Sequence, residues 1–134
     1  MEERITTAGI VVEEGRLLVG RRRTEGSLID GRWEFIGGKN RWGESCEETL
    51  RREFMEELGV EVSVGDYLTQ VDFTNAGVSY HLKAYEVVLL SHDFKLSVHS
   101  TLSFLSPEEV WKLDLVDSDR RILYFLLHKD GLKE

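Results

Sequence analysis

The chain has 134 residues, 41% of them apolar, which suits one compact domain over residues 1–134. Its net charge of −8 argues against a general nucleic-acid-coating role, because binding a nucleic acid polymer needs a basic surface. The absence of a membrane-length apolar run and of a signal-peptide pattern, with Cys46 as the single cysteine, predicts a cytoplasmic protein without membrane partners or an internal disulfide.

The first part of the chain is predicted to form strands joined by glycine-rich turns. Two strands cover roughly residues 5–12 and 16–22 and turn at Glu14-Gly15. A glycine-rich loop region follows, with a short strand at 33–36. This region leads directly into a segment with a different periodicity.

Residues 44–58 have the periodicity of an amphipathic helix. Leu50, Phe54 and Leu58 repeat at every fourth position, which places them in one apolar stripe. Gly59 follows directly and is a typical left-handed C-terminal cap. The segment therefore predicts a helix that ends at Leu58 and packs one face into the core.

The remaining chain is predicted to add strands before two closing helices. Long strands at 60–73 and 78–90 are joined by a turn near 75–77, and 101–105 forms a further strand. The sequence SPEE from Ser106 begins a short helix, with serine as cap, proline at the first position and Glu109 closing a capping box.

The last segment, DSDRRILYFLLHKDG, predicts an amphipathic helix that begins near Asp117 and stops at Gly131. Strands and helices are mixed along the chain without a regular alternation. This pattern predicts an α+β fold in which helices cover the faces of a mixed sheet.

Three glutamates crowd the end of the helix predicted at 44–58. At about 100° per residue, Glu57 lies about 40° to one side of Glu53 and Glu56 about 60° to the other, so all three share a face beside the apolar stripe. Like charges at this spacing destabilise a helix, and a hard divalent cation such as Mg²⁺ would offset their repulsion. The alternative is a solvated acidic face, which is common on surface helices.

This acidic helix and the glycines before it resemble the Nudix family, whose characteristic box is filled at every fixed position. The run RWEFIGGK at 32–39 also resembles the corresponding run of MutT-type members. The matching box positions are Gly38, Glu44, Arg52-Glu53-Phe54, Glu56-Glu57 and Gly59-Val60. The resemblance implies the Nudix α/β/α sandwich, an α+β fold with a central mixed sheet.

The resemblance also implies roles for the box residues. Glu44 and Arg52 would support the geometry of loop and helix, with Arg52 anchoring carboxylates, and Gly38 would allow the close turn. Either Glu53 or Glu56 would orient or deprotonate the attacking water. The implied ligands of Mg²⁺ or Mn²⁺ are Glu53, Glu56, Glu57 and the backbone oxygen of Gly37.

The reaction implied by the resemblance is Mg²⁺-dependent hydrolysis of a nucleoside diphosphate linked to another group. The leading substrate is a (d)NTP, including an oxidised one, which would yield (d)NMP and pyrophosphate. Hydrolysis of nucleotide sugars or dinucleoside polyphosphates is one alternative, and a nucleotide-sensing domain without turnover is another. The expected partner is a small-molecule nucleotide, and both a monomer and a homodimer are compatible with the sequence.

Candidate nucleotide-binding residues lie around the box, and most have a structural alternative. Asp119 falls where related proteins place a base-reading side chain, but capping of the last helix explains it equally well, and capping is favoured for Asp117. A stacking role suits Trp33 best. For the basic run at 21–23, a phosphate or base contact and an exposed strand end are equally consistent. The candidates are Arg23, Trp33, Gly38, Lys39, Tyr80 and Asp119.

Several positions depart from the family pattern. Ile36 replaces the proline that usually precedes the two glycines, which predicts a looser loop. His99 lies where related enzymes often place another glutamate ligand; an ordinary loop histidine is the favoured interpretation, and a metal ligand or a base the alternative. For Phe35, core packing competes with stacking on a base.

Overall fold

A computed structural model describes residues 1–24 and 31–129 of the chain. In this part of the chain, strands and helices follow one another without regular alternation, as predicted. The elements are β1 (Glu2–Ile10), β2 (Val12–Glu13), β3 (Arg16–Arg22), β4 (Trp33–Glu34), α1 (Cys46–Leu58), β5 (Val62–Asn75), β6 (Val78–Leu89), β7 (His99–Leu105), α2 (Pro107–Trp111) and α3 (Asp117–His128). None of the described helices is long and apolar enough to cross a membrane.

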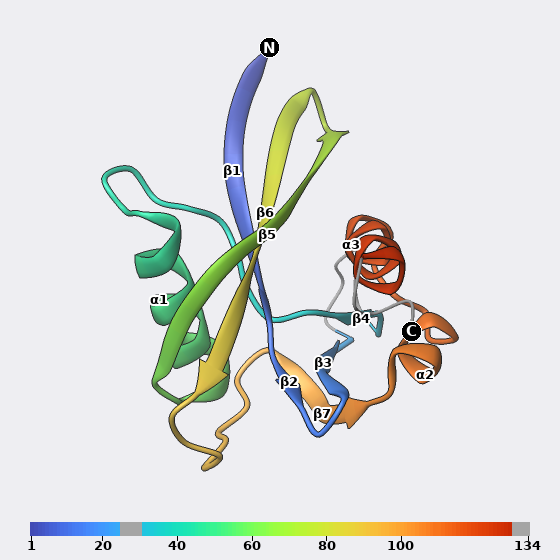
Figure 1. Cartoon of the computed structure of the whole chain (residues 1–134). Coiled ribbons are helices and arrows are strands. Elements are labelled where there is room, and N and C mark those ends of the chain that lie inside the picture. Colours follow the sequence, from blue (N-terminus) through green and yellow to red (C-terminus); the bar gives the residue numbers. More distant parts are fainter. Residues whose placement is uncertain (25–30, 130–134) are drawn as a thin grey trace.

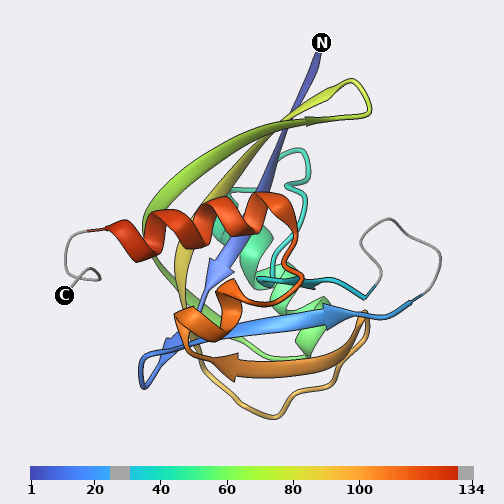
Figure 2. The ribbon, with the colours of Figure 1, turned by 90° about the vertical axis from the view of Figure 1, so that its right-hand side faces the viewer.

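The strands form a mixed sheet and a second, antiparallel sheet. In the mixed sheet, β6 lies in the middle, parallel to β1 and antiparallel to β5. In the second sheet, β3 pairs antiparallel with β2, β4 and β7 (Figure 2). The expected α+β fold with a mixed sheet is confirmed.

Two hydrophobic clusters lie on opposite sides of the strands, and each contains the buried stripe of one helix. The first takes Leu50, Phe54 and Leu58 from α1, and the second takes Ile122 and other residues from α3. The alternation of side chains along a strand feeds both clusters, because neighbouring residues point to opposite faces. The helices α1 and α3 therefore cover opposite sides of the strands (Figure 1).

The predicted helix ends are largely confirmed. Gly59 has a φ of 70° and its N–H donates to the Met55 carbonyl, which ends α1 where the sequence predicts. Ser106 and Glu109 form the predicted capping box at the start of α2. The predicted stop at Gly131 lies outside the described residues.

The structure contradicts the prediction that an aspartate caps α3. Its N-cap is Val116, which makes no side-chain cap hydrogen bond. Asp117 instead pairs with the Arg32 guanidinium, Oδ1 to Nη2, at 3.1 Å, and Asp119 turns inward to the Phe35 backbone. Tertiary partners across the chain have replaced the local cap.

The segment 36–39 pairs with β1 through backbone hydrogen bonds. The prediction that Ile36 makes this loop looser is therefore wrong. Ile36 is fully buried, and its carbonyl accepts a hydrogen bond from the Gly9 N–H at 2.7 Å. Thr7 N–H donates to the Gly38 carbonyl at 2.8 Å. Burial and backbone pairing thus hold the loop without a proline.

Candidate active site

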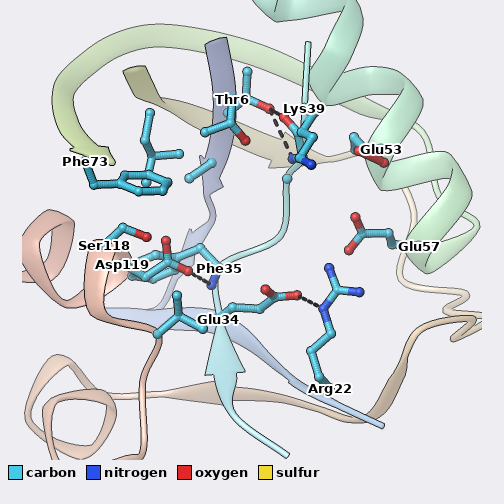
Figure 3. Close-up of a pocket in the computed structure, with 16 residues that line it drawn as sticks. Thr6, Arg22, Glu34, Phe35, Lys39, Glu53, Glu57, Phe73, Ser118 and Asp119 are labelled. Carbon is cyan, nitrogen blue, oxygen red and sulfur yellow. Dashed lines mark hydrogen bonds and ion pairs between the residues drawn. The ribbon is translucent and has the colours of Figure 1, made fainter. Parts of the chain in front are cut away.

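A cavity of about 400 Å³ opens where β1, the segment after β4, α1 and α3 meet (Figure 3). Carboxylates from α1 lie on one side of it, and Phe73 and Asp119 lie on the other. Its lining residues are Thr6, Thr7, Ala8, Arg22, Glu34, Phe35, Gly37, Gly38, Lys39, Glu53, Glu57, Phe73, Leu82, Val116, Ser118 and Asp119. The cavity therefore joins residues from the whole length of the chain.

Gly37 and Gly38 are required because other atoms approach their backbone closely. A Cβ at Gly37 would collide with the Thr7 carbonyl, and one at Gly38 would collide with the Glu53 carboxylate. Any side chain at position 38 would therefore push Glu53 away from the loop. The two glycines allow main-chain oxygens and a carboxylate to share one wall of the cavity.

This close approach predicts that Gly38→Ala lowers activity by displacing Glu53. We expect kcat/KM to fall by roughly 10- to 100-fold, because a small misplacement of a catalytic group is costly. Gly65→Ala is the matched control, since its added Cβ would meet only ordinary contacts starting at 3.4 Å. Nucleotide hydrolysis and thermal unfolding of both variants test the prediction, and equal activity of the two would contradict it.

The three glutamates of α1 differ in their exposure. The side chains of Glu53 and Glu57 are 14% and 8% exposed, and both line the cavity. Glu56 is 49% exposed, does not line the cavity, and pairs with Arg52 at 3.3 Å and Arg41 at 3.9 Å. The structure brings two of the predicted carboxylates into the cavity lining and leaves the third, Glu56, outside it.

Arg52 and Glu44 form hydrogen bonds that connect the glycine loop before α1 to the helix itself. Arg52 Nε donates to Glu44 Oε2 at 2.6 Å and Arg52 Nη2 donates to Glu44 Oε1 at 3.0 Å, a bidentate pair. This hydrogen bonding lowers the pKa of Glu44 to about 2. Arg52 Nη2 also donates to the Lys39 carbonyl at 3.0 Å. One guanidinium thus ties the glycine loop to the helix.

Glu57 is held in a position where a lone carboxylate is unfavourable. Burial, followed by the nearby charges of Glu34 and Glu53, raises the pKa of Glu57 to about 9. Burial also raises the pKa of Glu53. Glu57 Oε1 is buried and has no hydrogen-bond partner among the residues that the structure describes.

These observations fit a divalent cation. Carboxylate and backbone carbonyl oxygens are the ligands that Mg²⁺ and Mn²⁺ prefer, and a cation would compensate the buried charges. Glu34, Glu53, Glu57 and the Gly37 backbone are cavity-lining groups that carry such oxygens, whereas Glu56 is not part of the lining. Glu34, Glu57 and His99 also have potential ligand atoms within 4.8 Å of one another.

The opposite side of the cavity suits a flat, polar group. Phe73 lines it and stacks on Tyr80, with ring centroids 5.1 Å apart and an interplanar angle of 16°. Asp119 is buried beside it, and its Oδ2 accepts a hydrogen bond from the Phe35 N–H at 2.9 Å. Burial raises the pKa of Asp119 to about 8, so near neutrality this group offers both a donor and an acceptor.

The sequence model of the NUDIX domain matches residues 3–126 of this chain. The chain belongs to the Nudix family. It is 34% identical over 116 residues to the CTP pyrophosphohydrolase of Escherichia coli K12, an overlap of 87% of this chain and 85% of that protein. It is 31% identical over 110 residues to the 8-oxo-dGTP diphosphatase of Proteus vulgaris, an overlap of 82% and 80%.

Solved structures support the same assignment. The solution structure of the E. coli ORF135 protein has a TM-score of 0.83 and 30% identity, and the match covers 100% of this chain and 96% of that one. The MutT protein of Methanosarcina mazei Go1 has a TM-score of 0.81 and 27% identity, with 92% and 91% covered. The chain is a MutT-like Nudix pyrophosphohydrolase, an enzyme that acts on nucleotides. Members of this family typically use a divalent metal.

The Nudix cavity contains only some of the predicted nucleotide-binding residues. Gly38, Lys39 and Asp119 line it. Tyr80 lies behind Phe73 and beneath the Lys39 ammonium, which is 5.8 Å from its ring centroid. Tyr80 therefore supports the wall of the cavity from outside it.

Trp33 and Arg23 lie elsewhere in the Nudix domain. Trp33 is absent from the cavity lining, and its backbone pairs with Asp114 and Val116 on the segment before α3. Arg23 lines a neighbouring cavity of about 490 Å³, which also contains Arg22. Phe35 both lines the main cavity and belongs to a hydrophobic cluster, so the two roles considered for it coexist.

Sequence reasoning missed several residues of this Nudix cavity. Glu34 lies in the run RWEFIGGK and Phe73 in the strand predicted at 60–73, but no site role was predicted for either residue. His99 is not the loop histidine expected, because it begins β7 and is fully buried beside Glu34. A polar residue in a short strand next to the box was the available signal for Glu34.

The pKa of Glu57 predicts a pH-dependent effect of Mg²⁺ on stability. Its folded pKa of about 9 lies above the ordinary 4.5, so its contribution is full below about pH 4.5 and is lost as pH rises toward 9. Because a cation binds the carboxylate, we expect Mg²⁺ to raise Tm more at about pH 8.5 than at about pH 6. Thermal unfolding with and without Mg²⁺ measures this, and Glu57→Gln should remove the difference.

Proposed function

We propose that this Nudix enzyme is a Mg²⁺-dependent nucleoside triphosphate pyrophosphohydrolase, with Mn²⁺ as an alternative cation, that releases a nucleoside monophosphate and pyrophosphate. One observation carries the proposal: a single cavity joins a buried acidic wall to an aromatic and polar wall. The acidic wall suits the phosphates through a cation, and the other wall suits a nucleobase. A nucleotide spanning the cavity would reach both.

At the phosphate end, the protein contributes ligands for the cation, a general base for the attacking water and a positively charged side chain for the phosphates. Glu53, Glu56, Glu57 and the Gly37 carbonyl would hold the cation, which when bound neutralises phosphate charge and activates water. Glu53 faces the cavity, so it is the better placed carboxylate to orient or deprotonate the attacking water, with Glu56 the alternative. Lys39 lines the same wall and would contact a phosphate.

In-line attack by this water on the α-phosphorus would break its bond to the bridging oxygen, so that pyrophosphate leaves and the nucleoside monophosphate remains. The proton passes to the carboxylate that oriented the water, so no covalent intermediate on the protein is required. Arg52 and Glu44 hold the loop and the helix in register while this occurs.

At the base end, Phe73 and Asp119 would read the nucleobase. Stacking on an aromatic ring is worth about 1–3 kcal/mol per base and tolerates any base. The carboxyl group of Asp119 adds paired donor and acceptor positions, which select between base edges. The names of the relatives point to a cytosine or an oxidised guanine base as the substrates to test first.

A hydrolysis screen tests the proposal. Pyrophosphate release is measured with Mg²⁺ and Mn²⁺ over canonical and oxidised nucleotides, nucleotide sugars and dinucleoside polyphosphates. Metal-dependent release of pyrophosphate from a nucleoside triphosphate is expected. Preference for a nucleotide sugar or a dinucleoside polyphosphate would replace the proposed substrate, and nucleotide binding without turnover of any compound would overturn the proposed activity.

A further inference from the structure

Three polar residues of the cavity lining, Arg22, Glu34 and Glu57, surround the fully buried His99, which does not line the cavity itself. His99 Nε2 lies 2.8 Å from Glu34 Oε2, and the same Glu34 oxygen accepts a hydrogen bond from Arg22 Nε at 2.8 Å. On its other side, His99 Nε2 lies 3.8 Å from Glu57 Oε1, the buried oxygen without a partner among the described residues. The ligand-bearing helix α1 and the strand β7 meet at these atoms.

The geometry fixes which ring nitrogen carries the proton. Glu34 is paired with a guanidinium and offers only acceptor oxygens, so His99 Nε2 must be the donor. The other ring nitrogen, Nδ1, is buried and has no partner within the described part of the chain, so a proton there would be unpaired. The Nε2–H therefore lies between two carboxyl groups.

The position of this imidazole is fixed by its surroundings. The ring rests on the Gly20 backbone, where an added Cβ would lie 2.7 Å from its Cδ2. The segment before β7 is bonded to the end of α1, since Lys95 N–H donates to the Leu58 carbonyl at 2.8 Å and Ser97 Oγ donates to the Glu56 carbonyl at 2.8 Å. The segment that precedes His99 is thus attached by hydrogen bonds to the last turn of α1.

We propose that His99 is a positioning residue for Glu57. Its Nε2–H is hydrogen-bonded to Glu34 at 2.8 Å and faces Glu57 Oε1 at 3.8 Å, so it would attract that oxygen and set the orientation of the Glu57 carboxylate. A shortening of about 0.9 Å would bring Nε2 and Oε1 within hydrogen-bond distance. The inference rests on the proposed function, because it assumes that Glu57 is a cation ligand.

Direct titration with Mn²⁺ tests this role, with the free ion followed by electron paramagnetic resonance on the full chain. His99→Asn removes the donor at the Nε2 position, while His99→Gln places an amide N–H there. We expect His99→Asn to weaken Mn²⁺ binding about 10- to 100-fold, the usual effect of losing a partner of a metal ligand, and His99→Gln to stay within about 3-fold of wild type. His92→Asn is the control, because His92 is exposed and pairs with Glu13 on the surface.

A second variant tests the same role without removing any polar group. Gly20→Ala displaces the ring, and we expect it to weaken Mn²⁺ binding about 10-fold. A saturating concentration of Mn²⁺ should restore most of kcat in the His99→Asn and Gly20→Ala variants, which general damage to the fold would not allow. Thermal unfolding identifies any variant that is not folded.

The outcomes separate this inference from the proposed function. Mn²⁺ affinity equal to wild type in folded His99→Asn, or equal losses in folded His99→Gln and His99→Asn, would overturn the positioning role alone. A nitrogen coupling from a coordinated imidazole in the pulsed spectrum of the Mn²⁺-loaded wild type would also overturn it, by making His99 a ligand. Failure of the wild type to bind Mn²⁺ would overturn both. Unchanged Mn²⁺ binding by Glu57→Gln would overturn the positioning role and the assignment of Glu57 as a ligand, but not the proposed pyrophosphohydrolase activity.

Discussion

Replacing Glu57 with glutamine is expected to lower kcat/KM for the preferred nucleotide by roughly 10²- to 10³-fold, as when one preorganised electrostatic group is removed. Glu57 is a buried carboxyl group of the cavity, so the substitution removes a charge that no solvent can replace. The fold should survive, because glutamine keeps the side-chain volume and is uncharged, like the carboxyl group of Glu57 below its raised pKa of about 9. Pyrophosphate release at saturating Mg²⁺ and thermal unfolding measure the two effects.

Three further substitutions make this result interpretable. Glu47→Gln is the matched control, because Glu47 lies on the same helix but is exposed and away from the cavity. Glu53→Gln should lose as much activity as Glu57→Gln. The effect of Glu56→Gln decides which carboxylate orients the water: a loss as large as that of Glu53→Gln would favour Glu56. Activity of Glu57→Gln within about 3-fold of wild type would contradict its assigned role.

The second large effect is expected at Asp119. Asp119→Ala removes the polar group of the base wall and leaves the Phe35 N–H, now bonded to it at 2.9 Å, without this partner. We expect kcat/KM for the preferred nucleotide to fall by about 100-fold or more and the preference among bases to weaken. Competition assays with pairs of nucleoside triphosphates measure the preference directly.

Asp119→Asn is the informative companion variant, because an amide also offers one donor and one acceptor position. If the carboxyl group works in its protonated form, wild-type selectivity falls as pH rises through about 8, while the asparagine variant shows no such step. Asp66→Asn, on the exposed surface of β5, serves as the control. Unchanged base preference in Asp119→Ala would rule out a role in recognition.

Much of the scaffold could be predicted because the signals were local. The periodic stripe at Leu50, Phe54 and Leu58, the left-handed Gly59 and the capping box at Ser106 each depend on residues a few positions apart, and the structure contains all three. The spacing of the α1 glutamates likewise predicted that they share a face beside the apolar stripe, and Glu53 and Glu57 do line the cavity.

What could not be predicted depends on contacts between distant segments. Helical spacing alone does not distinguish Glu56 from Glu57. In the structure Glu57 lies beside His99 and is buried, whereas Glu56 is half exposed. From the sequence, Asp119 was equally consistent with a helix cap and a base-reading residue. Its actual partner, the Phe35 N–H, lies 84 positions away in the sequence. Phe73 reaches the cavity only because β5 crosses it beside α3, and strand periodicity does not show which face meets a ligand.

The two hydrophobic clusters on opposite sides of the strands have a consequence for how this enzyme can diversify. The helix that carries the acids is anchored in one cluster, while the base wall, through Phe73 and α3, is anchored in the other. Substitutions that remodel the second cluster can change which nucleotide fits without disturbing the first. Turnover chemistry and substrate choice can therefore evolve as nearly independent traits in this single small domain.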